Sequence, residues 1–137
     1  MLPRTLSALL LAVALTGASA AAHHSFAVFF DDSKSITIRG TVTEFRFTNP
    51  HGIITVTGGP EGRAQETWRA ETNAPTILRR RGWTATSLKA GDVITIEGWP
   101  SRDGKPYMRM RRVLRADGSV LGTPVAAPGT DPSGERK

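Results

Sequence analysis

The stretch TVTEFRFTNPH, residues 41–51, decides the fold of this chain. It continues a period-two apolar pattern that begins near residue 35, which is typical of a half-buried strand. The pattern changes phase between Val42 and Phe45, so we predict a bulge or sharp bend near residues 43–44. One long bent strand can then serve two sheets. The strand ends at the Asn-Pro-His corner, because proline has no N–H for a strand ladder.

The rest of the mature chain predicts four more strands and one helix. The helix is expected at residues 75–81, with Asn73 as its cap, Pro75 in its first turn and Gly82 just past its end. An order of three strands, one helix and two strands matches the five-stranded Greek-key barrel called the OB-fold. We therefore predict an all-β domain with one short helix, an OB-fold-like barrel over residues 35–121. The five strands are expected at about 35–47, 52–57, 65–71, 93–99 and 107–114.

Both ends of the chain differ from the barrel in composition. Residues 1–20 hold one cation, a short apolar run and small residues at a cleavage position, which indicates a secretory signal peptide and a periplasmic or secreted protein. Residues 21–34 form an N-terminal arm, a short strand or a segment packed on the core. Residues 122–137 are rich in Pro, Gly, Ala and Ser and predict a disordered tail. No apolar run in the mature chain is long enough to span a membrane.

Composition limits the chemistry that the protein can perform. Cysteine is absent, so disulfides and thiolate sites are excluded. The formal net charge is +6, which favours acidic partners such as anionic polysaccharide or other envelope components. Export makes nucleic acid an unexpected partner. The oligomeric state is left open.

The three histidines are the strongest candidates for a site. His23 and His24 follow the signal peptide, and His51 lies at the corner after the first strand. Neutral imidazole binds copper, zinc or nickel. An arm folded across the barrel would bring His23 and His24 to His51, so the sequence predicts a site for copper or another transition metal. The alternative is that His51 bonds within its own corner while His23 and His24 face solvent.

The position of signal cleavage decides how the terminus could bind copper. Cleavage after Ala20 leaves Ala21-Ala22-His23, whose amine, backbone amides and imidazole suit square-planar Cu(II) or Ni(II). Cleavage after Ala22 makes His23 the first residue, and its amine and ring could chelate copper together with a second histidine. N-terminal sequencing distinguishes the two.

A second candidate surface is basic. Several arginines lie on or near strands and the helix, where aromatic residues could add stacking to charge contacts with an anionic ligand. Most of the aromatic residues are expected in the core instead, and so are Met108 and Met110, although thioethers also bind Cu(I). The candidate ligand-binding residues are Arg79, Arg80, Arg81, Arg109 and Arg111.

Catalytic motifs are missing from the sequence. There is no GxSxG, no HExxH and no Gly-rich phosphate loop between a strand and a helix. We therefore predict a binding protein rather than an enzyme.

Five short blocks give the chain a resemblance to a known family. In order, they are HHSF at residues 23–26, GTV at 40–42, TNPH at 48–51, RGW at 81–83 and LKAGD at 88–92. This set resembles an uncharacterised family of secreted bacterial proteins that is described only as a domain of unknown function. The resemblance covers residues 23–121. It implies export and a single small β-domain, and it brings no established activity or site residue.

Overall fold

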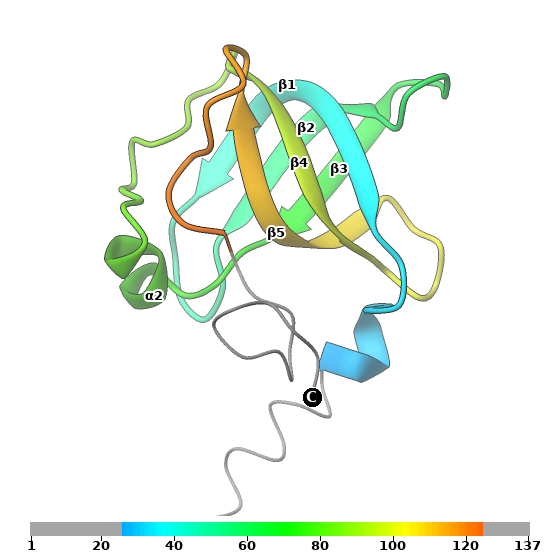
Figure 1. The fold of residues 1–137 in the computed structure, drawn as a ribbon, viewed down its shortest axis with the longest axis horizontal. Coiled ribbons are helices and arrows are strands. Elements are labelled where there is room, and N and C mark those ends of the chain that lie inside the picture. Colours follow the sequence, from blue (N-terminus) through cyan, green and yellow to red (C-terminus); the bar gives the residue numbers. More distant parts are fainter. Residues whose placement is uncertain (1–25, 125–137) are drawn as a thin grey trace, which may run out of the picture.

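The structure is a computed structural model that describes residues 26–124. Its main element is a closed five-stranded barrel with the strand order β1-β2-β3-β5-β4 (Figure 1). This confirms the predicted all-β barrel with one short helix in the domain. The elements are β1 (Ile36–Arg46), β2 (Ile53–Gly59), β3 (Glu66–Glu71), α2 (Pro75–Arg80), β4 (Val93–Pro100) and β5 (Tyr107–Arg115).

Strand β1 pairs with a neighbouring strand along each of its two edges. It runs antiparallel to β4 from Ile36 to Thr41 and antiparallel to β2 from Arg39 to Arg46. Its register shifts between Val42 and Glu44, which confirms the predicted bend. The barrel closes where β3 and β5 run parallel over three paired positions.

The core fills the inside of the barrel with alternate residues of every strand. Ile38, Ile54, Ile96 and Val113 are each at most 1% exposed. Met108 and Met110 also face inward and are fully buried, which confirms their prediction as core residues. Trp83 and Leu88, from the segment between α2 and β4, complete the core cluster.

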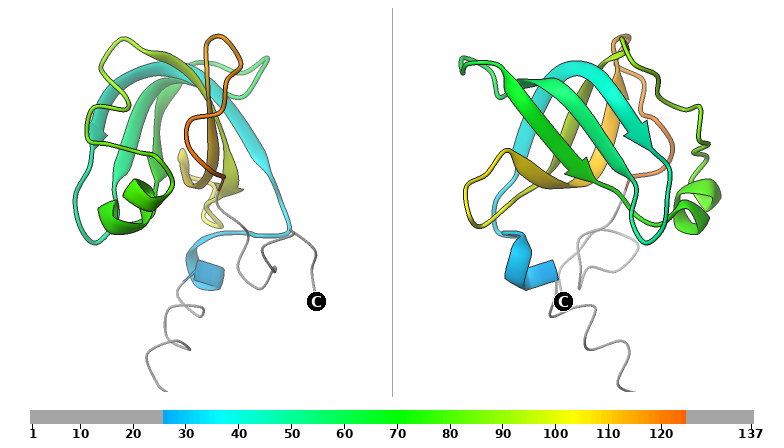
Figure 2. Two further views of the ribbon diagram at one scale, coloured as in Figure 1. Left: turned by 60° about the vertical axis from the view of Figure 1, so that its left-hand side comes forward. Right: turned by 180° about the vertical axis from the view of Figure 1, so that it is seen from behind.

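Helix α2 lies at the end of the barrel where β1 and β3 finish (Figures 1 and 2). It buries Pro75 and Leu78 and ends before Gly82, which has a φ of +84°. That left-handed conformation suits glycine, as the sequence predicted. The predicted cap was wrong. Ala74 occupies the N-cap and has no side-chain group to cap the helix, while the Asn73 side chain accepts a hydrogen bond from Arg109.

The described chain begins with a helical turn over residues 26–29 rather than the short strand (Figure 2). A strand would have buried Val28, which is 65% exposed. The segment is nevertheless packed on the barrel, as the alternative prediction had it. Phe26 meets Trp99 edge-on, and Phe30 packs on Tyr107, both with ring centroids 5.5 Å apart.

Of the tail predicted from residue 122, only residues 122–124 are described. Thr123 N donates to the Arg81 carbonyl at 3.0 Å, so residues 122–124 lie against the segment after α2. Residues 125–137 lie outside the described part of the chain. Over residues 26–124, no helix has the length and apolar character needed to cross a membrane.

Candidate functional site

The corner after β1 is fixed against the segment that follows β3. It contains a cis Asn49–Pro50 bond and leads through His51 to the buried Gly52. The Gly52 carbonyl accepts a hydrogen bond from Thr72 N at 2.8 Å. A Cβ on Gly52 would lie 2.6 Å from Thr72 Oγ1 and 2.8 Å from the Arg46 carbonyl. Only glycine fits this close approach, and the packing sets the position of His51.

Beside the corner, Glu71 and Arg109 form an ion pair on the outer side of the barrel. Parallel pairing of β3 with β5 places the two residues directly opposite each other. Arg109 Nη1 donates to Glu71 Oε1 at 2.7 Å and to the Thr72 carbonyl at 2.9 Å, while Nη2 donates to Asn73 Oδ1. The Tyr107 hydroxyl donates to Glu71 Oε2. The side chains of Arg109 and Glu71 are only 12% and 19% exposed, so each charge depends on the other.

Protonation in this cluster follows from burial and from the Glu71 charge. Burial lowers the pKa of the Arg109 guanidinium, against the opposing effect of Glu71. Burial also raises the pKa of Tyr107, and its hydrogen bond to the Glu71 carboxylate adds to the rise. The Tyr107 phenol is therefore neutral at neutral pH and donates its hydrogen to Glu71.

The same geometry assigns the proton on the His51 ring. Nδ1 lies 3.1 Å from the Thr72 carbonyl, 3.1 Å from Arg109 Nη1 and 3.5 Å from Glu71 Oε1. Nη1 carries two hydrogens, and its shorter contacts to Glu71 and Thr72 use both. In the tautomer with its hydrogen on Nδ1, the ring donates to the Thr72 carbonyl. The lone pair of the neutral ring then lies on Nε2.

This arrangement suits His51 to bind an electron-pair acceptor. Histidine ligands of metals commonly donate their second ring N–H to a backbone carbonyl or carboxylate, which fixes the ring and its tautomer. The Thr72 carbonyl and Glu71 surround Nδ1 in this way. The His51 side chain is 45% exposed, so Nε2 can be reached from solvent. A metal ion or a hydrogen-bond donor fits here better than an anion.

The three predicted histidines can be followed only in part. His23 and His24 lie outside the described residues, so their meeting with His51 stays a prediction. Within residues 26–124, no group of three or more His, Asp or Glu side chains is arranged to hold a metal ion. His51 would therefore need ligands from another part of the chain.

The five predicted arginines do not form one surface. Arg109 is held in the cluster around Glu71, so its hydrogen-bonding groups face other protein atoms. Arg111 is exposed two positions along β5. Arg79 and Arg80 are exposed on α2, and Arg81 follows directly.

The sequence did not reveal Glu71, Thr72, Asn73 and Tyr107 as neighbours of His51. Glu71 follows the buried Ala70 on β3, and Arg109 lies between the buried Met108 and Met110 on β5, so alternation in the sequence places both side chains outward. The missing information was the register of β3 against β5, which are separated by a helix and another strand. In an OB-fold these two strands lie side by side, and that rule could have suggested the pair.

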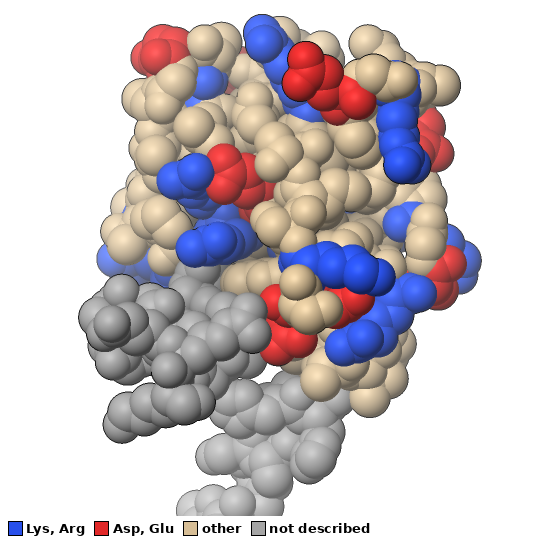
Figure 3. Space-filling model, turned by 45° about the vertical axis from the view of Figure 1, so that its right-hand side comes forward, with Lys and Arg blue, Asp and Glu red and all other residues tan. Residues whose placement is uncertain are grey.

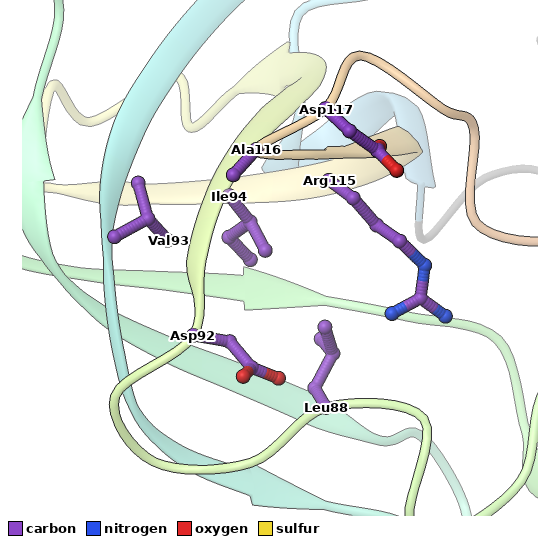
Figure 4. Close-up of a pocket in the computed structure, with 7 residues that line it drawn as sticks. All are labelled: Leu88, Asp92, Val93, Ile94, Arg115, Ala116 and Asp117. Carbon is purple, nitrogen blue, oxygen red and sulfur yellow. The ribbon is translucent and has the colours of Figure 1, made fainter.

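A separate groove of about 270 Å³ lies at the other end of β5 (Figure 4). It runs between the turn before β4 and the turn after β5, whereas the His51 cluster lies where β5 begins. The groove has no histidine and shares no residue with the cluster. Its lining residues are Leu88, Asp92, Val93, Ile94, Arg115, Ala116 and Asp117.

Comparison with known proteins identifies the family of the chain. No curated protein and no solved structure matches it. Residues 10–109 match the model of a family of unknown function (DUF6152), and the chain therefore belongs to that family.

Proposed function

We propose that this small β-barrel protein binds a transition-metal ion, with copper as the leading candidate, through His51 and the histidines of its N-terminal segment. The observation that carries the proposal is the fixed ring of His51. Its Nδ1 lies 3.1 Å from the Thr72 carbonyl, and in the tautomer with hydrogen on Nδ1 the Nε2 lone pair is left to a ligand. Nitrogen ligands of this kind suit copper, nickel and zinc.

The docked arm supports a contribution from His23 and His24. Phe30 packs on Tyr107, whose hydroxyl donates to Glu71, and Glu71 lies 3.5 Å from the His51 ring. The arm thus joins the barrel on the same polar cluster. From Phe26 back to His23, three residues of extended chain span about 10 Å. The N-terminal histidines can use that reach to complete the site.

The rest of the proposal concerns where the protein works and what it does there. Residues 1–20 act as a cleaved signal peptide, and the mature protein is periplasmic or secreted. The protein binds its ligand without transforming it. Intact-mass measurement of the exported protein tests the first point and defines the terminus available to copper.

Titration of the mature protein with Cu(II) and with Zn(II), followed by calorimetry, tests metal binding. His51→Ala and a His23→Ala/His24→Ala double variant should each weaken binding of the preferred metal by at least about tenfold, since each removes a ligand. Arg111→Gln is the control. This exposed residue on β5 is not a proposed ligand, so its replacement should leave the affinity unchanged. Equal affinity in wild type and His51→Ala would refute the shared site.

We propose, as the alternative, that the barrel binds anionic polysaccharide or other anionic envelope components without a metal. Its support is a charge imbalance: residues 72–91 hold four cations and no carboxylate. Such a segment attracts polyanions. Retention of the mature protein on immobilised heparin, falling steeply with salt, is the expected result. Failure to bind at low salt would exclude this alternative.

A further inference from the structure

The cations of residues 72–91 are concentrated at α2. Arg79 and Arg80 are exposed in the last turn of the helix, and Arg81 follows them. Of the carboxylates in the described part of the chain, none forms an ion pair with these three arginines. The neighbouring corner, residues 45–52, adds Arg46 and contributes no acid. We name the surface formed by Phe47, Arg79 and Arg80 the α2 surface.

Elsewhere in the described residues, several of the positive charges are paired with carboxylates. The side of the molecule that Figure 3 brings forward, away from α2, mixes Lys and Arg with Asp and Glu. Within the described residues, neither Arg79 nor Arg80 is in an ion pair, whereas the neighbouring Arg46 lies 3.8 Å from Glu44. The paired examples are Lys34–Asp31, Lys105–Asp103, Arg109–Glu71 and Arg112–Glu97.

The α2 surface also holds one of its cations in place. The Arg79 guanidinium lies 5.2 Å above the ring of Phe47. That ring packs on Phe45 at 5.7 Å, and Phe45 packs on the buried Trp83 at 5.9 Å. A column of rings thus connects Arg79 to the core. A guanidinium already positioned on an aromatic face loses less freedom when it binds an anion.

We propose that the α2 surface is a binding site for an acidic polysaccharide, with Arg79 and Arg80 contacting the acid groups of successive sugars. The inference specifies the surface for the alternative function above and rests on it, but it is independent of the histidines. A lipid bilayer fits less well. Ile77 is the sole exposed large aliphatic residue within residues 72–91, whereas adsorption to a bilayer requires buried apolar area.

The test compares two double variants that lose the same charge. Arg79→Gln/Arg80→Gln removes the α2 cations, and Arg63→Gln/Arg115→Gln removes two exposed arginines at the other end of the barrel (Figure 1). Each protein is titrated with a heparin oligosaccharide at several salt concentrations. We expect the α2 variant to bind about tenfold or more weakly and with a salt dependence lower by about two released ions. The control should change by less than about threefold.

Four outcomes would overturn the inference. If both variants lose affinity equally, net charge alone attracts the polymer and the α2 surface is no site. If the α2 variant and the control bind heparin equally but differ in their binding to vesicles that contain phosphatidylglycerol, the partner is a membrane. If the wild-type protein does not bind heparin, the alternative function fails as well. If wild type binds heparin and the α2 variant binds it with the same affinity, only the proposed surface is rejected. Unchanged unfolding midpoints confirm that the variants are folded.

Discussion

Gly52 is the residue that brings the His51 corner against the end of β3. A Cβ there would meet Thr72 Oγ1 and the Arg46 carbonyl at distances well below normal contact. We predict that Gly52→Ala lowers the free energy of unfolding by about 1–3 kcal/mol, because this is overpacking against backbone. Urea denaturation measures it. Gly59→Ala is a matched control with its nearest contact at 3.2 Å, and an equal loss in both would contradict the argument.

Tyr107 gives the polar cluster a signature at alkaline pH. Its pKa in the folded protein is raised above the ordinary value by burial and by Glu71. A raised pKa means that the folded state holds the proton more tightly, so the stabilisation is complete below about pH 10 and is lost as pH rises further. We predict that wild-type stability falls above about pH 10, and that Tyr107→Phe falls less steeply. Parallel pH curves for the two proteins would count against this effect.

At the scale of elements, only one face of the N-terminal turn packs against the barrel. Phe30 is 4% exposed against Tyr107, whereas the adjacent Phe29 is 62% exposed. We predict that Phe30→Ala lowers the free energy of unfolding by about 3 kcal/mol, as a buried phenylalanine does, and that Phe29→Ala changes it little. Chemical denaturation of both variants tests this. Equal effects would mean that the turn is not packed as described.

In the proposed metal site, the arm connects the N-terminal histidines to the polar cluster. Its anchoring extends beyond ring packing. Phe30 forms a bridge with Ser101, and Asp31 N donates to the Pro100 carbonyl at 3.0 Å. Hydrogen bonds from Ser33 and Lys34 lower the pKa of Asp31 to about 2, so the turn keeps its carboxylate charge in mildly acidic conditions. An element fixed by its own contacts can present the preceding histidines in a limited region.

At the scale of the whole molecule, the strand pairs that form the barrel differ in the number of their paired positions. β1 and β2 pair at seven positions, and β3 and β5 pair at three. Since local opening follows the weakest pairing, we predict that amides at the β3–β5 seam exchange hydrogen faster than those between β1 and β2. Native-state hydrogen exchange measures the order. Slower exchange at the β3–β5 seam would show that the buried ion pair beside it compensates for the short ladder.

Local sequence chemistry was sufficient to determine the fold. The phase change after Val42 located the bend in β1, and Gly82 located the end of α2. These features act within a few residues, so period and turn chemistry reveal them. Three strands, a helix and two strands then leave few barrel topologies.

The tertiary structure decided the surroundings of His51. Glu71 and Arg109 are 38 positions apart, and only closure of the barrel sets them opposite each other. Asn73 was expected as the helix cap, but Ala74 is the N-cap and the Asn73 side chain accepts a hydrogen bond from the largely buried Arg109 guanidinium. Such choices depend on distances between strands remote in sequence, which no local pattern encodes.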